Sequence, residues 1–288
     1  MSFDYTLEQI ETLRDIRYHR KPELRLQSEQ EALRFINEVG FCFLFGDRDV
    51  EIPTLWAAIC GSRRAVPNEH FDREVGLTWD WKDTLPTRGE VYYGKLLRGK
   101  PTLVSLELLP HFYALSPNYG SIEDYLEQYE EGRLSVEAKN IYEVLLKEGG
   151  MATSRLRQLA GLAGGGVAAR RFDRALAELQ VGLKIVKVGI SDANRWGYAY
   201  VYDLFLRRFP EIPELARQIN SDQATATLLL RHLHNVVVET ERASQHLFRW
   251  EDWAWERLMR RLTERGLIRR DVRVEGWEGE CLAESESE

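Results

Sequence analysis

The sequence predicts a predominantly helical α+β protein built from tandem winged helix-turn-helix modules with small β-hairpins. The first observation is that three helix-like stretches with apolar residues at helical spacing are followed by short β-branched and aromatic runs. The second is that this order occurs in Ser135–Asp203 and recurs after Ser221. The third is an apolar content of 44% and an aromatic content of 11%, which is enough for packed cores, while no window approaches the ~20 apolar residues of a membrane span.

Composition divides the 288 residues into four segments. We expect a mixed α/β domain at 1–131, for which a degenerate winged helix is one interpretation, and winged helices at 132–209 and 210–275. Residues 276–288 carry Gly-Glu and Ser-Glu runs that are typical of a disordered acidic tail. The net charge is −7, yet residues 132–208 hold 13 Lys and Arg against 7 Asp and Glu. Any contact with nucleic acid is therefore expected in this basic segment.

The N-terminal region is expected to mix helices with one buried strand. Ser28 precedes an amphipathic helix as an N-cap, and the apolar run Phe41–Phe45 that follows predicts the strand. The expected helices are Leu7–His19, Glu29–Val39, Pro53–Cys60, Glu90–Leu97 and Ile122–Tyr129.

Two tryptophans alternate with acids in the stretch Gly76–Leu85. Trp79 and Trp81, beside a Lys-Asp pair, could form a pocket that stacks a base or another flat ligand. Packing of an aromatic surface against the rest of the chain is the more ordinary interpretation of the same pattern.

The central module is expected to contain three helices and a hairpin. Ser135 and Thr153 are good N-caps, and the loop Ser191–Arg195 has turn chemistry. The helices are expected at Ser135–Lys147, from Thr153, and at Val167–Val181, with strands at Lys184–Val188 and Tyr198–Tyr202.

The C-terminal module repeats this order. Its helices are expected at Ser221–Val237, Thr240–Leu247 and Glu251–Arg265, and a strand or hairpin at Leu267–Val274. The third helix again carries arginines, namely Arg257, Arg260, Arg261 and Arg265.

A winged helix commonly places its third helix in the major groove of DNA and its hairpin against the backbone. The sequence therefore predicts double-stranded DNA as the partner of the central module. Solvated arginines, or a winged helix that docks protein, would give the same pattern. The predicted DNA-contacting residues are Arg155, Arg157, Arg170, Arg171, Arg174, Lys184 and Arg195.

The sequence gives little support for a metal site or for a phosphate-binding loop. The three cysteines and six histidines lack metal-ligand spacing, and Gly164–Gly166 lacks the Lys-Ser/Thr that completes a phosphate-binding loop. We therefore expect no metal and no cofactor. The N-terminus has no basic-then-apolar signal pattern, so a reducing cytoplasm is the expected compartment.

Three stretches carry a resemblance to a known family. They are Arg171–Leu179, the hairpin entry Trp196–Tyr198, and Ser105–Pro110. In these stretches, and in the order of its elements over roughly residues 25–275, the chain resembles the winged-helix crosslink-repair DNA glycosylases of the YcaQ/AlkZ type. The resemblance implies tandem winged helices around a concave DNA-binding face. It also implies excision of damaged bases from alkylated or crosslinked DNA without a metal.

The chain departs from that family where catalysis is expected. The family carries Gln-x-Gln or Gln-x-Asp on the strand after the first apolar helix, whereas this strand is Phe41–Phe45, so no catalytic residue is carried over. The first hypothesis is a DNA-binding protein of this lineage without standard glycosylase chemistry. The second is an active glycosylase that uses Asp47, Asp49 or Asp80, with Trp79 or Trp81 stacking a flipped base. The third is a protein-docking module. The lesion recognised and the oligomeric state stay open.

Overall fold

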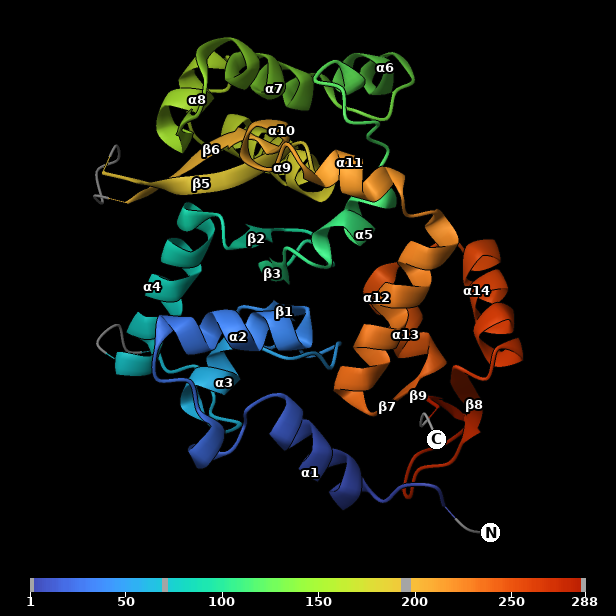
Figure 1. The fold of residues 1–288 in the computed structure, drawn as a ribbon. Coiled ribbons are helices and arrows are strands. Elements are labelled where there is room, and N and C mark those ends of the chain that lie inside the picture. Colours follow the sequence, from blue (N-terminus) through green and yellow to red (C-terminus); the bar gives the residue numbers. More distant parts are fainter. Residues whose placement is uncertain (1–2, 69–71, 193–197, 286–288) are drawn as a thin grey trace. The chain divides into compact units, whose positions relative to one another are not determined.

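The computed structural model describes residues 3–68, 72–192 and 198–285, and the chain divides into two compact units (Figure 1). One unit contains residues 1–79 and 221–288, and the other is the continuous segment 80–220. Helices predominate and the strands form small antiparallel pairs, which confirms the predicted α+β class. Within the described ranges, no helix is long and apolar enough to cross a membrane.

The discontinuous unit begins with short capped helices. As predicted, the Ser28 hydroxyl caps the second helix and accepts a hydrogen bond from the Glu31 N–H at 3.3 Å. The strand after this helix is fully buried. The elements are α1 (Leu7–Arg17), a 3₁₀ turn (Pro22–Leu24), α2 (Glu29–Val39), β1 (Phe41–Phe43) and α3 (Leu55–Cys60).

The C-terminal part of this unit contains three helices and three strands. They are α12 (Ser221–Val236), β7 (Val238–Thr240), α13 (Glu241–Phe248), α14 (Asp252–Glu264), β8 (Ile268–Val272) and β9 (Cys281–Glu284). The strands form an antiparallel sheet in the order β7-β9-β8. Leu233 of α12, with Trp255 and Met259 of α14, forms the core beneath them.

The prediction of a disordered tail at 276–288 is wrong for residues 281–284. These residues form β9, the central strand of the sheet, and the side chains of Cys281, Leu282 and Ala283 are only 1% exposed. The acidic composition around this strand concealed a four-residue segment that pairs with two neighbours at once. The sheet that begins with β7 therefore extends beyond the predicted boundary at residue 275.

The continuous unit starts within α4 (Arg73–Arg88) and continues through β2 (Val91–Gly94), β3 (Thr102–Ser105), α5 (Leu109–Ala114) and α6 (Asp124–Glu130). The expected helix at Glu90–Leu97 is instead strand β2, which pairs antiparallel with β3. Valine and tyrosine favour strands, and this preference prevailed over a helical spacing of only a few residues.

The rest of the unit repeats the order seen after residue 221. It contains α7 (Val136–Glu148), β4 (Met151–Ala152), α8 (Thr153–Leu159), α9 (Val167–Val181), β5 (Ile185–Ser191), β6 (Ala199–Leu204), α10 (Phe205–Arg208) and α11 (Ile212–Arg217). The strand order β4-β6-β5 matches β7-β9-β8 position by position, because the last strand is central in both. Figure 1 shows α7 and α8 beside the β5–β6 hairpin.

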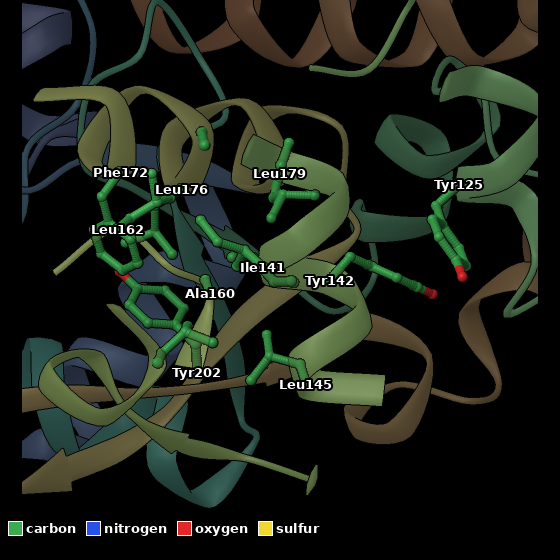
Figure 2. Close-up of a cluster of buried hydrophobic side chains, with 14 of the residues drawn as sticks. Tyr125, Ile141, Tyr142, Leu145, Ala160, Leu162, Phe172, Leu176, Leu179 and Tyr202 are labelled. Carbon is green, nitrogen blue, oxygen red and sulfur yellow. The ribbon is translucent and has the colours of Figure 1, made fainter. Parts of the chain in front are cut away.

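The core of this unit fixes the orientation of α9. Phe172, Leu176 and Leu179 point from α9 toward Ile141 and Leu145 of α7 (Figure 2). Burying such a face stabilises the unit by about 1.5–3 kcal/mol for each large side chain.

A carboxylate adds to this packing. Glu178 of α9 accepts hydrogen bonds from the N–H of Ser135 at 2.7 Å and from its hydroxyl at 2.6 Å. Ser135 is the N-cap of α7, so the start of α7 is tied to α9.

Candidate nucleic-acid interface

The surface of α8 and α9 carries the predicted cations in two groups. Arg170 and Arg174 lie one helical turn apart on α9, off the Phe172 face, and both are exposed, as is Arg155 on α8. Within the described residues these three guanidinium groups form no ion pair, so they are available to an anionic partner.

The other two arginines of these helices already contact carboxylates. Arg171 donates to Glu137 at 2.6 Å and holds the pKa of that carboxyl below its usual value. Arg157 lies 3.2 Å from Asp173 and over the ring of Phe172. DNA phosphates would have to compete with these carboxylates, so Arg171 and Arg157 are weaker candidates than the exposed three.

One predicted contact, Lys184, falls outside this surface. Lys184 is only 6% exposed and donates to the side-chain oxygen of Asn118 at 2.8 Å. Burial lowers the pKa of Lys184 to about 8. This placement contradicts a DNA contact, because Lys184, the residue before strand β5, is buried and points to Asn118 rather than to the surface. Arg195 lies outside the described residues.

The predicted stacking pocket between Trp79 and Trp81 is not formed. The two residues are two positions apart on α4, so their side chains point about 160° apart around the helix. Trp79 is 44% exposed with its ring 6.2 Å from that of Phe45, whereas Trp81 is 4% exposed. Residues two positions apart share a face in a strand, but this segment is a helix, in which they do not.

Apolar side chains occupy the strand where the resembling family has its polar pair. Phe41, Cys42 and Phe43 are at most 1% exposed. The Phe41 ring stacks on His232 at 6.5 Å and meets the edge of Phe248 at 6.2 Å. Burial raises the pKa of the Cys42 thiol far above its usual value, which leaves it unreactive.

The three aspartates of the alternative catalytic hypothesis are spread along the chain. Asp47 accepts a hydrogen bond from the Asp49 N–H at 2.9 Å in the turn after β1. Asp47 also lines a cavity of about 410 Å³ together with Trp56. Asp80 lies exposed on α4.

A larger cavity of about 530 Å³ lies between α8 and the start of β6. Polar groups of α8, including Ser154, Arg157 and Gln158, form one wall, and Tyr198 and Tyr200 form another. The Thr153 hydroxyl donates to the Tyr200 carbonyl at 2.7 Å and holds the two walls together. The volume is within the range of small-ligand pockets.

A buried charged cluster lies directly behind the tyrosine wall. The Lys82 amino group of α4 donates to Asp83 at 2.6 Å, to the Tyr198 hydroxyl at 2.7 Å and to the Tyr200 hydroxyl at 2.9 Å. Lys187 of β5 donates to the same oxygen of Asp83. The Lys82 and Lys187 side chains are 0% and 1% exposed.

The electrostatics of the cluster follow from this crowding. Burial, and then repulsion from Lys187, lowers the pKa of Lys82 to about 8. Burial also lowers the pKa of Lys187. For Asp83, burial acts to raise the pKa, but the hydrogen bonds from Lys187 and Lys82 prevail and lower it. The Asp83 carboxylate therefore lies between two lysines whose charged forms burial disfavours.

The sequence did not predict this cluster, although it contained weak signals. Tyr198 and Tyr200 alternate around the start of a strand, so they share a face. The Lys82-Asp83 pair was visible beside the tryptophans. No local spacing links either pair to Lys187, since only tertiary folding brings these residues together.

In the part of the chain that the structure describes, no group of three or more His, Cys, Asp or Glu side chains is arranged to hold a metal ion.

Comparisons with known proteins relate the chain to one family and to the fold of a solved structure. Residues 26–249 match the model of the AlkZ-related family. Among solved structures, the chain is similar to the DNA glycosylase AlkZ of Streptomyces sahachiroi, with a TM-score of 0.58 and 14% sequence identity over 97% of this chain and 70% of that chain. At this identity the likeness concerns the fold. No curated protein matches the chain.

Proposed function

The chain belongs to the AlkZ-related family, and on this basis we propose that it binds double-stranded DNA in a repair-related role without standard glycosylase chemistry. The observation that carries the proposal is the exposed face of Arg155, Arg170 and Arg174. This face lies in the basic segment of an otherwise acidic chain. Arginine on a helix surface is the usual means of contacting phosphates.

We interpret the two repeated helix-strand arrangements as winged helices. In both, the order is helix, strand, helix, helix, strand, strand, and the last strand is central. The central module then covers 132–209, and the C-terminal module extends from 210 to the end of β9 at residue 284. The segment 1–131 repeats the order of elements from α2 to β3, which supports a degenerate third copy.

In this interpretation α9 is the helix that approaches the major groove. Its inner face is held by α7, and its outer face presents Arg170 and Arg174 one turn apart. The β5–β6 hairpin would then contact the backbone.

The C-terminal module offers fewer cations. Arg257 and Arg261 of α14 both contact Asp222, which leaves Arg260 exposed on the same helix. We therefore assign the main contact to the central module.

The absence of standard chemistry is proposed from the environment of β1. A water-activating amide or carboxylate at Phe41 or Phe43 would need access to solvent and substrate, but both side chains are buried, and Phe41 packs against the rings of His232 and Phe248. If this is correct, alkylated or crosslinked duplex incubated with the protein yields no abasic sites. Their appearance, detected by alkaline strand cleavage, would favour the alternative that Asp47, Asp49 or Asp80 acts in an active glycosylase.

We also place the protein in the cytoplasm. All three cysteines are free, and Cys42 and Cys281 are buried, which suits a reducing compartment.

Fluorescence anisotropy with a labelled duplex over a range of salt concentrations tests the DNA proposal. The variant Arg155→Ala/Arg170→Ala/Arg174→Ala removes up to three phosphate contacts. We expect weaker binding and a salt slope that is smaller by up to about 2.7, since each contact contributes about 0.9.

The matched control is Arg133→Ala/Lys147→Ala/Arg217→Ala, which removes three exposed cations elsewhere in the same unit. Because both triple variants change the net charge by the same amount, only the position of the charges differs. An equal loss in both variants, or duplex binding by the wild type that is absent or independent of salt, would refute the proposed interface.

A further inference from the structure

The buried cluster and the cavity on α8 share a wall. Tyr198 and Tyr200 line the cavity of about 530 Å³, and the hydroxyls of the same two residues accept hydrogen bonds from Lys82 at 2.7 and 2.9 Å. The same two tyrosines therefore contact the buried amine and line a cavity whose other wall contains Ser154, Arg157 and Gln158.

Burying these charged groups costs more free energy than the fold requires for its stability. Two lysine side chains that are 0% and 1% exposed share one carboxylate oxygen, so the cluster carries an excess positive charge when every group is ionised. Apolar side chains of similar volume often stabilise such a position equally well or better. Perturbed ionisable groups beside a cavity are typical of functional sites.

The neighbours of Lys82 match the requirements of a nucleophilic amine. A second cation nearby and a desolvated position both favour the neutral amine, which is the reactive form. Burial and Lys187 lower the pKa of Lys82 to about 8. At pH 8 the neutral fraction is then about a hundredfold larger than that of an ordinary surface lysine.

We propose that Lys82 forms an imine with an aldehyde bound in the cavity between α8 and Tyr198. The aldehyde oxygen would replace the Tyr198 hydroxyl as the hydrogen-bonding neighbour of the amine. The nitrogen adds to the carbonyl carbon, and its two hydrogens leave with the carbonyl oxygen as water, so a C=N bond replaces the C=O bond. The Tyr200 hydroxyl and Asp83 are placed to transfer these protons.

The chemical class of the ligand is a ring-opened sugar aldehyde. The cavity volume is sufficient for a sugar phosphate, and Arg157 on its wall is the cationic group for the phosphate, which would compete with Asp173 for the guanidinium. Such an aldehyde occurs as a free sugar phosphate and within duplex DNA at an abasic site. The DNA form of this inference rests on the proposed function, whereas the free form does not.

Reductive trapping tests the inference in two arms. The full-length protein at pH 8 is incubated with sodium cyanoborohydride and either 2-deoxyribose 5-phosphate or a duplex with a single abasic site. Adducts are then located by digestion and mass spectrometry. We expect a stable secondary amine on Lys82 in at least one arm, and its loss in Lys82→Met.

Lys184 provides an internal control within the same unit. Burial lowers its pKa to about 8 as well, but it donates to Asn118, whereas Lys82 donates to the two tyrosines that line the cavity. Preferential labelling of Lys82 over Lys184 supports the cavity geometry. Equal labelling of both residues, or adducts only on surface lysines, overturns the inference even if Lys82→Met does not fold, because the mapping is made on the wild type.

The two arms separate this inference from the proposed function. A Lys82 adduct with the sugar phosphate in a protein that does not bind duplex would support the imine and refute DNA binding. Duplex binding without a Lys82 adduct in either arm would support DNA binding and refute the imine.

Discussion

A single proline in α4 leaves the backbone carbonyl of Lys82 open to a hydrogen bond from Lys187. Pro86 has no N–H, so the Lys82 carbonyl four residues earlier lacks its usual helical donor. The Lys187 amino group donates to that carbonyl at 3.4 Å as well as to Asp83. The sequence could indicate the missing donor, but it could not indicate that a lysine 105 residues away along the chain would replace it.

At the residue scale, the lowered pKa of Lys82 predicts a pH-dependent stability. Its pKa of about 8 in the folded protein lies below the ordinary value of 10.5, so between these values the unfolded chain binds more protons. The stability of the wild type relative to Lys82→Met should therefore rise from pH 7.5 to 9.5. Melting temperatures of the two proteins across this range test the prediction. Lys184 also has a lowered pKa, but its contribution to the pH dependence is the same in both proteins and drops out of the difference.

The tyrosines of the cluster limit the pH window. Burial raises the pKa of Tyr93, Tyr198 and Tyr200 above 10, so above pH 10 the unfolded chain loses protons that the folded chain keeps. Stability then falls with pH in both proteins, so the comparison should stop at pH 9.5. A constant difference in melting temperature between 7.5 and 9.5 would mean that Lys82 titrates normally.

At the scale of elements, predictions succeeded where local chemistry decides and failed where distant pairing does. The N-caps Ser28 and Ser135 mark the starts of α2 and α7 as predicted, whereas the predicted cap Thr153 is the first residue of α8 and makes no cap hydrogen bond. Each cap needs only the next three residues, so local sequence is sufficient. Strands β2 and β9, in contrast, exist because a partner strand lies beside them.

The loop before β9 shows how such a strand was missed. Gly276 and Gly279 have positive φ angles of 77° and 84°, which are turn conformations, and Trp277 packs on the buried cluster of Val272 and Val274. The same glycines and acids are typical of disorder when no partner strand is known. A composition-based boundary therefore fell six residues before the strand.

This placement predicts that β9 is essential for the C-terminal module. A chain that ends at Glu275 loses the central strand and the buried side chains of Cys281, Leu282 and Ala283. We expect a destabilisation of at least about 3 kcal/mol, since a buried leucine alone contributes about 1.5–3 kcal/mol. Chemical denaturation and amide exchange of β7 and β8 measure it.

The control is a chain that ends at Ser285, which keeps β9 complete. If both truncated proteins match the full-length chain in stability and exchange, residues 276–284 are dispensable, and β9 does not form the centre of the sheet in solution.

At the scale of the whole molecule, the net charge is negative although one part of the surface is rich in arginine. The chain carries −7, but the exposed arginines of α8 and α9 make this part of the surface locally positive. Screening reduces the reach of the remaining acids to about 8 Å at physiological salt, whereas it is about 30 Å at 0.01 M. The local arginines should therefore govern DNA binding in the cell, and the total charge should matter only in dilute buffer.

Neutralising distant acids separates these two effects. Glu123, Glu127 and Glu130 are exposed on and just before α6, and changing all three to glutamine moves the net charge from −7 to −4. If local arginines govern binding, this variant binds duplex several-fold more tightly at 0.01 M salt and like the wild type at 0.15 M, because the distant field is then screened. Anisotropy titrations at both salt concentrations decide the matter. Tighter binding that persists at 0.15 M would show that the total charge, rather than the arginine face, sets the affinity.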